Sequence, residues 1–199
     1  MVTCTTPPFR AAVRLNSGVR HVMKVYRHIV LVLALGSQAA TANAQPEEIQ
    51  CGSDRVRTQL EEMQRTDISF RDGTGADLDS LNLTNLVKIV ETCGWPLISS
   101  YGKEAALGAF LVLQHAPLDA QLKYVDLLRE ANTKNELRKG SLPLLEDRIL
   151  VRQGKPQIYG SQMMAGGVPY PIFDEANLDR RRKEVGLGPY SEYLKDFQF

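Results

Sequence analysis

The residue types best suited to chemistry gather in one short stretch of the C-terminal half of the chain. Four side chains that both donate and accept hydrogen bonds fall within six positions: Gln157, Tyr159, Ser161 and Gln162. Polar groups beside an apolar stretch are costly unless they are paired or bind something. Strand-like alternation would place Gln157 and Tyr159 on one face. We therefore predict that these residues line a pocket for a small polar or anionic ligand.

His115 is the only histidine beyond residue 28, and with Gln114 it ends the most apolar segment after residue 44. Imidazole titrates near neutral pH, so His115 is a candidate general acid or base. The alternative is that the ring hydrogen-bonds the last carbonyl groups of a helix, at the negative end of its dipole. Gln114 is a candidate ligand-binding residue beside it.

Asp147 and Arg148 are two further candidates, and both are charged. Asp147 could orient His115, and the planar guanidinium of Arg148 suits a carboxylate or a phosphate. The alternative is structural, with Asp147 capping a turn and Arg148 pairing with it. The residue types leave both interpretations open.

These candidates support three functions. The first is a module that binds a small polar or anionic ligand through His115, Gln114, Arg148 and the four polar residues of the stretch 157–162. The second is a hydrolase-like acid–base enzyme in which His115 is the base, Asp147 orients it, and Tyr159 or Ser161 lies beside it. The third is a structural or interaction domain whose polar motifs form buried networks.

The sequence lacks the residue patterns that other chemistries require. The sequence has no CxxC or HExxH motif, so we expect no metal site. It has no P-loop, and Gly73-x-Gly75 lacks the third glycine of a dinucleotide site, so we expect no cofactor. Gly160-Ser161-Gln162 does not match a nucleophile elbow. Acidic residues flank the basic run 180–183, which favours a solvated helix face over a nucleic-acid site.

Helices must position most of these residues. Apolar periodicity predicts helices over 47–66, 82–93, 105–115, 119–131 and 174–182, with a loop over 71–80 and Asn82 as an N-cap. Residues 190–199 are expected to form a short terminal helix or a tail. The segment 105–113 is apolar all round, which predicts a buried central helix. A short helical turn is expected before Asp147. The stretch 149–159 reads as a β-hairpin around Gln153-Gly154. The expected fold is one mostly α domain with a small β-hairpin.

Residues 23–44 have the pattern of a secretory signal peptide. Lys24 and Arg27 precede the apolar run 29–35, and Ala42-Asn43-Ala44 matches a cleavage site. We therefore expect an exported protein, periplasmic or extracellular, whose mature domain spans 45–199 and has no membrane anchor. Residues 1–22 are expected to be a mis-called extension, with Met23 as the true start; a long n-region is the alternative.

The charge and the cysteines of the mature domain follow from that cleavage. Five of the 24 basic residues and none of the 23 acidic residues fall in 1–44, which leaves 19 basic residues and a net charge of −4. An acidic domain argues against nonspecific nucleic-acid binding. Cys51 and Cys93 remain, and an even pair in an exported protein predicts a disulfide. The helix prediction agrees, because it places the two cysteines at neighbouring ends of an antiparallel helix pair.

Five short motifs occur together in a fixed order: Gly94-Trp95-Pro96, Gln114-His115-Ala116, Asp147-Arg148, Gln157-x-Tyr159-Gly160-Ser161-Gln162, and Arg181-Arg182-x-Glu184-x-Gly186-Leu187 followed by Tyr193. Their order and spacing resemble a bacterial family catalogued as domain of unknown function 6624, over about residues 53–195. The family usually has threonine at Ser161 and aspartate at Pro117. The resemblance implies which positions matter, and it implies no activity.

Overall fold

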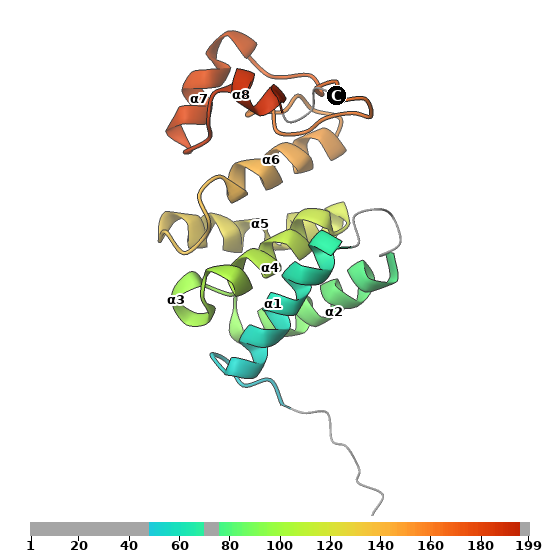
Figure 1. Cartoon of the computed structure of the whole chain (residues 1–199), viewed down its shortest axis with the longest axis vertical. Helices are drawn as coiled ribbons and strands as arrows, with labels where there is room; N and C mark the ends of the chain where they lie inside the picture. Colours follow the sequence, from blue (N-terminus) through green and yellow to red (C-terminus); the bar gives the residue numbers. More distant parts are fainter. Residues whose placement is uncertain (1–47, 70–75, 196–199) are drawn as a thin grey trace, which may run out of the picture. The chain divides into compact units, whose positions relative to one another are not determined.

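The computed structural model describes residues 48–69 and 76–195. The predicted signal peptide and the extension before it lie outside these residues. Within them the chain forms helices joined by turns and loops (Figure 1). The helices are α1 (Asp54–Ser69), α2 (Ala76–Cys93), α3 (Ile98–Tyr101), α4 (Lys103–His115), α5 (Leu118–Thr133), α6 (Ser141–Arg152), the 3-10 helix η3 (Glu175–Asn177), α7 (Leu178–Glu184) and α8 (Tyr190–Lys195).

The central helix of the fold is α4, which contacts α1, α2, α3, α5 and α6. Most of its residues are buried, so the prediction of a buried central helix is confirmed. Gly108 allows α1 to approach closely, because a Cβ atom at that position would lie 2.0 Å from the carbonyl oxygen of Leu60. The apolar core therefore forms around α4.

The predicted β-hairpin is wrong. Residues 149–151 continue α6 to Arg152, and the described part of the chain contains no strand. Leu142, Leu145 and Ile149 are buried at helical spacing on one face of α6. Burial of that face outweighs the strand preference of the β-branched residues. Gln157 makes only an isolated parallel bridge with Ile172. The expected short turn before Asp147 is the beginning of this full helix.

The start and the end of α2 can both be compared with the predicted boundaries of this helix. α2 begins at Ala76 rather than at Asn82, and residues 71–75 of the predicted loop lie outside the described residues. Asn82 lies inside α2, where its side-chain amide donates to the Thr66 hydroxyl of α1 at 3.0 Å. The predicted end of this helix at Gly94 is confirmed, because Gly94 adopts φ 77° and donates its N–H to Val90. A residue expected to cap one helix therefore joins two.

The predicted disulfide is confirmed. Cys51 lies just before α1 and Cys93 ends α2, and the bond joins them with their Cα atoms 5.5 Å apart. It links the start of one helix to the end of its neighbour. In the described ranges, no helix combines the length and apolar character needed to cross a membrane. A disulfide and this finding are both compatible with an exported protein.

Breaking the disulfide is expected to lower the free energy of unfolding by about 4 kcal/mol, because a bond spanning some 40 residues restricts the unfolded chain. The measurement is urea unfolding with and without reductant. The Cys51→Ser/Cys93→Ser variant is the control. Its urea midpoint should match that of the reduced protein and should not change when reductant is added. Equal midpoints for oxidised and reduced wild-type protein would contradict the expectation.

Candidate functional site

Asp147 organises the polar segment, defined here as residues 157–162. Its side chain is 0% exposed on the inner side of α6. The carboxylate accepts hydrogen bonds from the backbone N–H groups of Ile158 at 2.7 Å, Tyr159 at 3.0 and 3.2 Å, and Ser161 at 3.0 Å. A buried carboxylate is stable when several donors surround it. Asp147 therefore holds the backbone of the polar segment in place.

Gln157 closes the polar segment on itself. Its side chain is fully buried, and its amide nitrogen donates to the carbonyl oxygens of Gln162 at 3.0 Å and Tyr170 at 2.9 Å. Its amide oxygen accepts from the backbone N–H of Gln162 at 2.8 Å. These bonds use both ends of the carboxamide. Gln157, a predicted ligand-binding residue, is therefore committed to the loop itself.

The carbonyl groups of the polar segment are bound by α7 and α8. Arg181 donates to the carbonyl oxygen of Ile158 at 3.0 Å, and Arg182 donates to that of Tyr159 at 2.7 Å. The Tyr193 hydroxyl donates to that of Ser161 at 2.8 Å. Asp147 and these three side chains therefore satisfy N–H and C=O groups on opposite sides of one short segment.

Arg182 corrects the expectation of a solvated face over 180–183. It is 3% exposed and lies against the rings of Tyr190 and Tyr193, with its guanidinium carbon 5.5 and 5.0 Å from their centroids. Burial lowers the pKa of Arg182. Arg180 and Lys183 behave as expected, since both are exposed, and Arg180 pairs with Glu184 at 3.7 Å. The signal missed in the sequence is the i, i+3 spacing of the two tyrosines, which presents two rings to one cation.

Three predicted site residues do converge: Gln162, Arg148 and His115. The Arg148 Nε donates to the side-chain oxygen of Gln162 at 3.0 Å, and its NH1 atom lies 3.2 Å from His115 Nδ1. Arginine can only donate, so Nδ1 accepts and, in the neutral ring, the proton is on Nε2. Gln162 is itself held by Ser161, whose hydroxyl accepts from the Gln162 amide at 3.0 Å. Arg148, rather than Asp147, therefore orients His115.

The carbonyl groups at the end of α4 have partners other than His115. The Gln121 amide donates to the carbonyl oxygens of Leu113 at 3.2 Å and Gln114 at 2.8 Å. Arg152 donates to the carbonyl oxygen of Ala116. The Gln114 side chain is buried and donates to the carbonyl oxygen of Leu144 at 3.3 Å, between α4 and α6. Gln121 and Arg152 thus take the capping role that the structural alternative assigned to His115.

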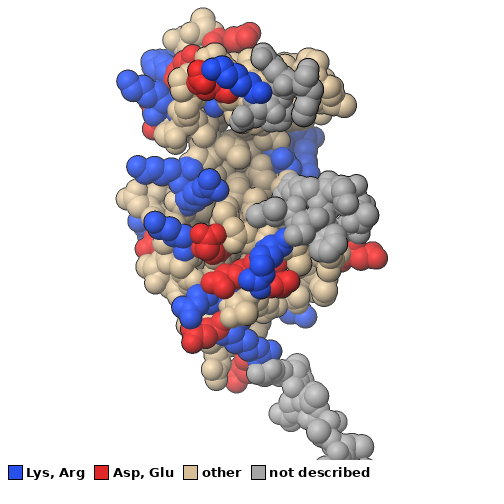
Figure 2. Space-filling model, in the orientation of Figure 1, with Lys and Arg blue, Asp and Glu red and all other residues tan. Residues whose placement is uncertain are grey.

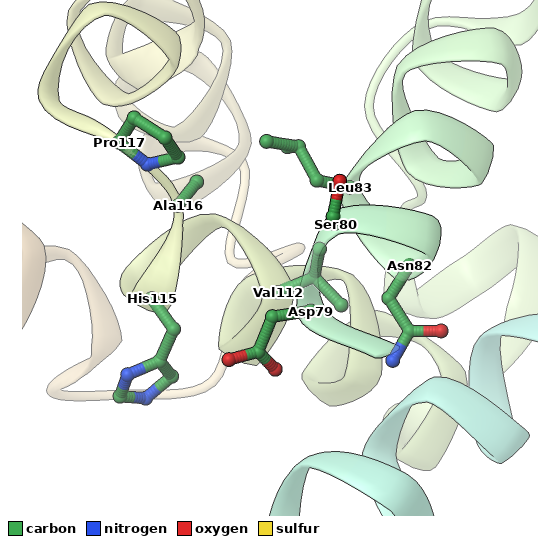
Figure 3. Close-up of a pocket in the computed structure, with 8 residues that line it drawn as sticks. All are labelled: Asp79, Ser80, Asn82, Leu83, Val112, His115, Ala116 and Pro117. Carbon is green, nitrogen blue, oxygen red and sulfur yellow. The ribbon is translucent and has the colours of Figure 1, made fainter. Parts of the chain in front are cut away.

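His115 lines a pocket of about 300 Å³ between α2 and the end of α4 (Figure 3). The edge of its ring away from Nδ1 faces the Asp79 carboxylate, which projects from the first turn of α2. Asp79 is a candidate that sequence reasoning missed, because it fell in the predicted loop 71–80, whereas the structure places it in α2. The other lining residues are Ser80, Asn82, Leu83, Val112, Ala116 and Pro117.

Tyr159 belongs to a different pocket. Its side chain is half-buried near the turn between α5 and α6 and the end of α7. Burial, together with the carboxylates of Glu146 and Asp147, raises the pKa of the Tyr159 hydroxyl. The phenol therefore remains a hydrogen-bond donor at neutral pH. The structure separates Tyr159 from His115, two residues expected in one site.

Among residues 48–69 and 76–195, no three His, Cys, Asp or Glu side chains lie together in a group that could hold a metal ion. His115 and Asp79 face the same pocket, and Arg148 lies behind the histidine. The arrangement can bind polar groups by hydrogen bonds and charge. Most of the other predicted residues serve to hold the backbone.

The described residues thus define a disulfide-linked helical domain in which a buried polar network lies behind a histidine-lined pocket. The chain belongs to a family of unknown function, DUF6624, whose model matches residues 54–198. This match confirms the resemblance carried by the five motifs, and it covers every polar site residue described above. No curated protein and no solved structure matches the chain.

Proposed function

We propose that this chain is an exported protein that binds a small polar ligand in the pocket between α2 and α4, with His115 as its central contact. The observation that carries the proposal is the orientation of His115, whose Nδ1 accepts from Arg148 at 3.2 Å. That bond sets the ring with its opposite edge toward the pocket (Figure 3). A side chain oriented by a second residue is typical of a binding site.

The chemistry of the pocket suggests the kind of ligand. The Nε2–H group of His115 is a donor, and the Asp79 carboxylate is an acceptor that carries a negative charge. Leu83, Val112 and Pro117 supply an apolar wall. A volume of about 300 Å³ suits a compact molecule with one apolar side and both donor and acceptor groups.

The same tautomer supports binding over general-base catalysis. A general base must accept a proton from its substrate, which requires a nitrogen without a proton. In His115 that nitrogen is Nδ1, and Arg148 occupies it. Asp147, the residue expected to orient a catalytic histidine, is bonded to the polar segment instead. These contacts favour the binding module over the hydrolase-like alternative.

The structural alternative accounts for a different set of residues. Asp147, Gln157 and Ser161 form bonds inside the protein, so their contribution is to the fold. His115 is the exception, because it both joins this network through Arg148 and lines a pocket. The proposal therefore places ligand contact at His115 and support of that contact in the network.

Replacing His115 by alanine is expected to abolish ligand-induced stabilisation while changing the free energy of unfolding by less than about 1 kcal/mol. The measurement is a thermal-shift screen of metabolites and cell-wall fragments on the exported protein. A ligand at 100 times its Kd should stabilise the wild type by about 2.7 kcal/mol, and the variant should show no shift. Mass spectrometry of the same preparation should give Gln45 as the N-terminus.

Two acidic positions provide a matched control for this screen. Asp79→Asn removes the charge that faces the pocket, and it should weaken binding at least tenfold. Asp77→Asn removes a charge from the same first turn of α2 without touching the pocket lining, and it should bind like the wild type. Equal binding by wild type and His115→Ala would overturn the proposal. A His115→Ala variant that loses several kcal/mol of stability and binds nothing would favour the structural alternative.

A further inference from the structure

The pocket that contains Tyr159 has a volume of about 410 Å³ and shares no lining residue with the His115 pocket. It lies where the turn between α5 and α6 meets the end of α7. We propose that it is a second binding site, for a small polyhydroxylated anion such as a sugar carrying a carboxylate or a phosphate. Its residues for this purpose are Lys139, Lys183, Tyr159, Asn132 and Asn135.

The charges of this pocket leave two cations available. Both acidic lining residues make ion pairs with arginines that are not lining residues. Glu146 pairs with Arg129 at 3.0 Å, an arginine that Asp126 also contacts, and Glu184 pairs with Arg180 at 3.7 Å. Lys139 and Lys183 are exposed, and among the described residues neither makes an ion pair. Figure 2 shows blue side chains over α7 and over the end of α5 near its turn into α6. An anion between them would meet two ammonium groups.

The neutral polar side chains of the pocket can hydrogen-bond the hydroxyl groups of a sugar. Within the described part of the chain, the side-chain amides of Asn132 and Asn135 and the hydroxyl of Tyr159 make no hydrogen bond. Carboxamides and a phenol both donate and accept, as sugar hydroxyls do. The volume far exceeds that of an inorganic anion and lies within the range of small-molecule sites. A sugar with one charged group would use both sets of residues.

The polar segment explains how Tyr159 is held in this position. Its backbone N–H is bound by Asp147, and its carbonyl oxygen is bound by Arg182. The phenol is therefore attached to a backbone that is fixed on both sides. A contact that is already ordered loses less entropy when a ligand binds. The buried network thereby gains a second use, which does not depend on His115.

The test is calorimetric titration of the full exported protein with glucose 6-phosphate and glucuronate, with inorganic phosphate and glucose as separate probes. At least one charged sugar should bind, and inorganic phosphate and glucose should each bind at least tenfold more weakly than it. The charged sugar that binds more tightly identifies phosphate or carboxylate as the preferred group. A concentration of about 10 mM still detects weak sites. Absence of binding by both charged sugars at that concentration would overturn the proposal.

Variants locate the binding. Lys139→Gln/Lys183→Gln should weaken the charged sugar at least tenfold, and Tyr159→Phe should weaken it about threefold to tenfold. Lys88→Gln/Lys155→Gln removes the same charge from exposed positions outside this pocket and should bind like the wild type. His115→Ala should also leave sugar binding unchanged, which separates this site from the first pocket. Undiminished binding by Lys139→Gln/Lys183→Gln, or equal affinity for inorganic phosphate and the sugars, would refute the site.

Discussion

Replacement of Asp147 by alanine is expected to lower the free energy of unfolding by about 3–5 kcal/mol, a large part of the stability of an ordinary domain. The carboxylate binds the N–H groups of Ile158, Tyr159 and Ser161, and alanine would leave all three without that acceptor. Each buried donor left unsatisfied costs about 1–3 kcal/mol. Water entering the vacated space would recover part of this loss, which is why the expected value lies below the simple total.

Urea unfolding measures this loss, and amide hydrogen exchange locates it. The amides of Ile158, Tyr159 and Ser161 should lose protection in Asp147→Ala before the amides of α4 do. Asp147→Asn should lie between wild type and Asp147→Ala, since it keeps one acceptor but adds a donor facing other donors. Asp126→Ala is the control, because Asp126 is exposed and, in the described part of the chain, pairs only with Arg129 on the surface. A loss below about 1 kcal/mol for Asp147→Ala would show that the network is dispensable.

The substitution Gly108→Ala is expected to cost about 2–4 kcal/mol, although alanine favours a helix over glycine by about 1 kcal/mol. The new Cβ atom would lie 2.0 Å from the carbonyl oxygen of Leu60 and 3.1 Å from the backbone nitrogen of Gln64. Both contacts are with the backbone of α1, which cannot rotate aside as a side chain can. The two helices would have to separate, and the core around Leu60 would lose packing.

Thermal and urea unfolding of Gly108→Ala would measure that cost. Gly188→Ala is the matched control, because a Cβ atom there would meet nothing within 4 Å and its backbone requires no positive φ. The control should stay within about 0.5 kcal/mol of wild type. If Gly108→Ala were as stable as Gly188→Ala, α1 and α4 would have to be able to shift apart without loss.

Local patterns predicted much of the helical framework. The apolar segment before Gln114 became the buried helix α4, and Gly94 ended α2, since periodicity and helix-stop residues act within a few turns of chain. The Cys51–Cys93 bond followed from the count of cysteines and the expected helix pair. The β-hairpin failed because Ile149 had a buried helical face available, which strand preference alone could not reveal.

The sequence could not show how the candidate site residues divide between the buried network and the two pockets. Gln157 and Tyr159 were expected on one face, yet Gln157 is buried in the network and Tyr159 reaches a separate pocket. Asp147 and Arg148 are adjacent in sequence, but successive helical positions point about 100° apart. One therefore bonds the polar segment and the other reaches His115. Asp79 and Arg182 acquire their roles only from partners distant in sequence.

The sequence by itself determined most of the helical framework, the disulfide and the short set of polar residues, because these depend on neighbours within a few turns and on residue chemistry. Tertiary structure alone decided which of those polar groups bind backbone and which face a pocket. The physical reason is that a buried polar group takes whichever partner the packing of distant helices brings within 3 Å or so. His115 is distinguished from the other candidates by that packing, which lets its ring both accept from Arg148 and line a pocket.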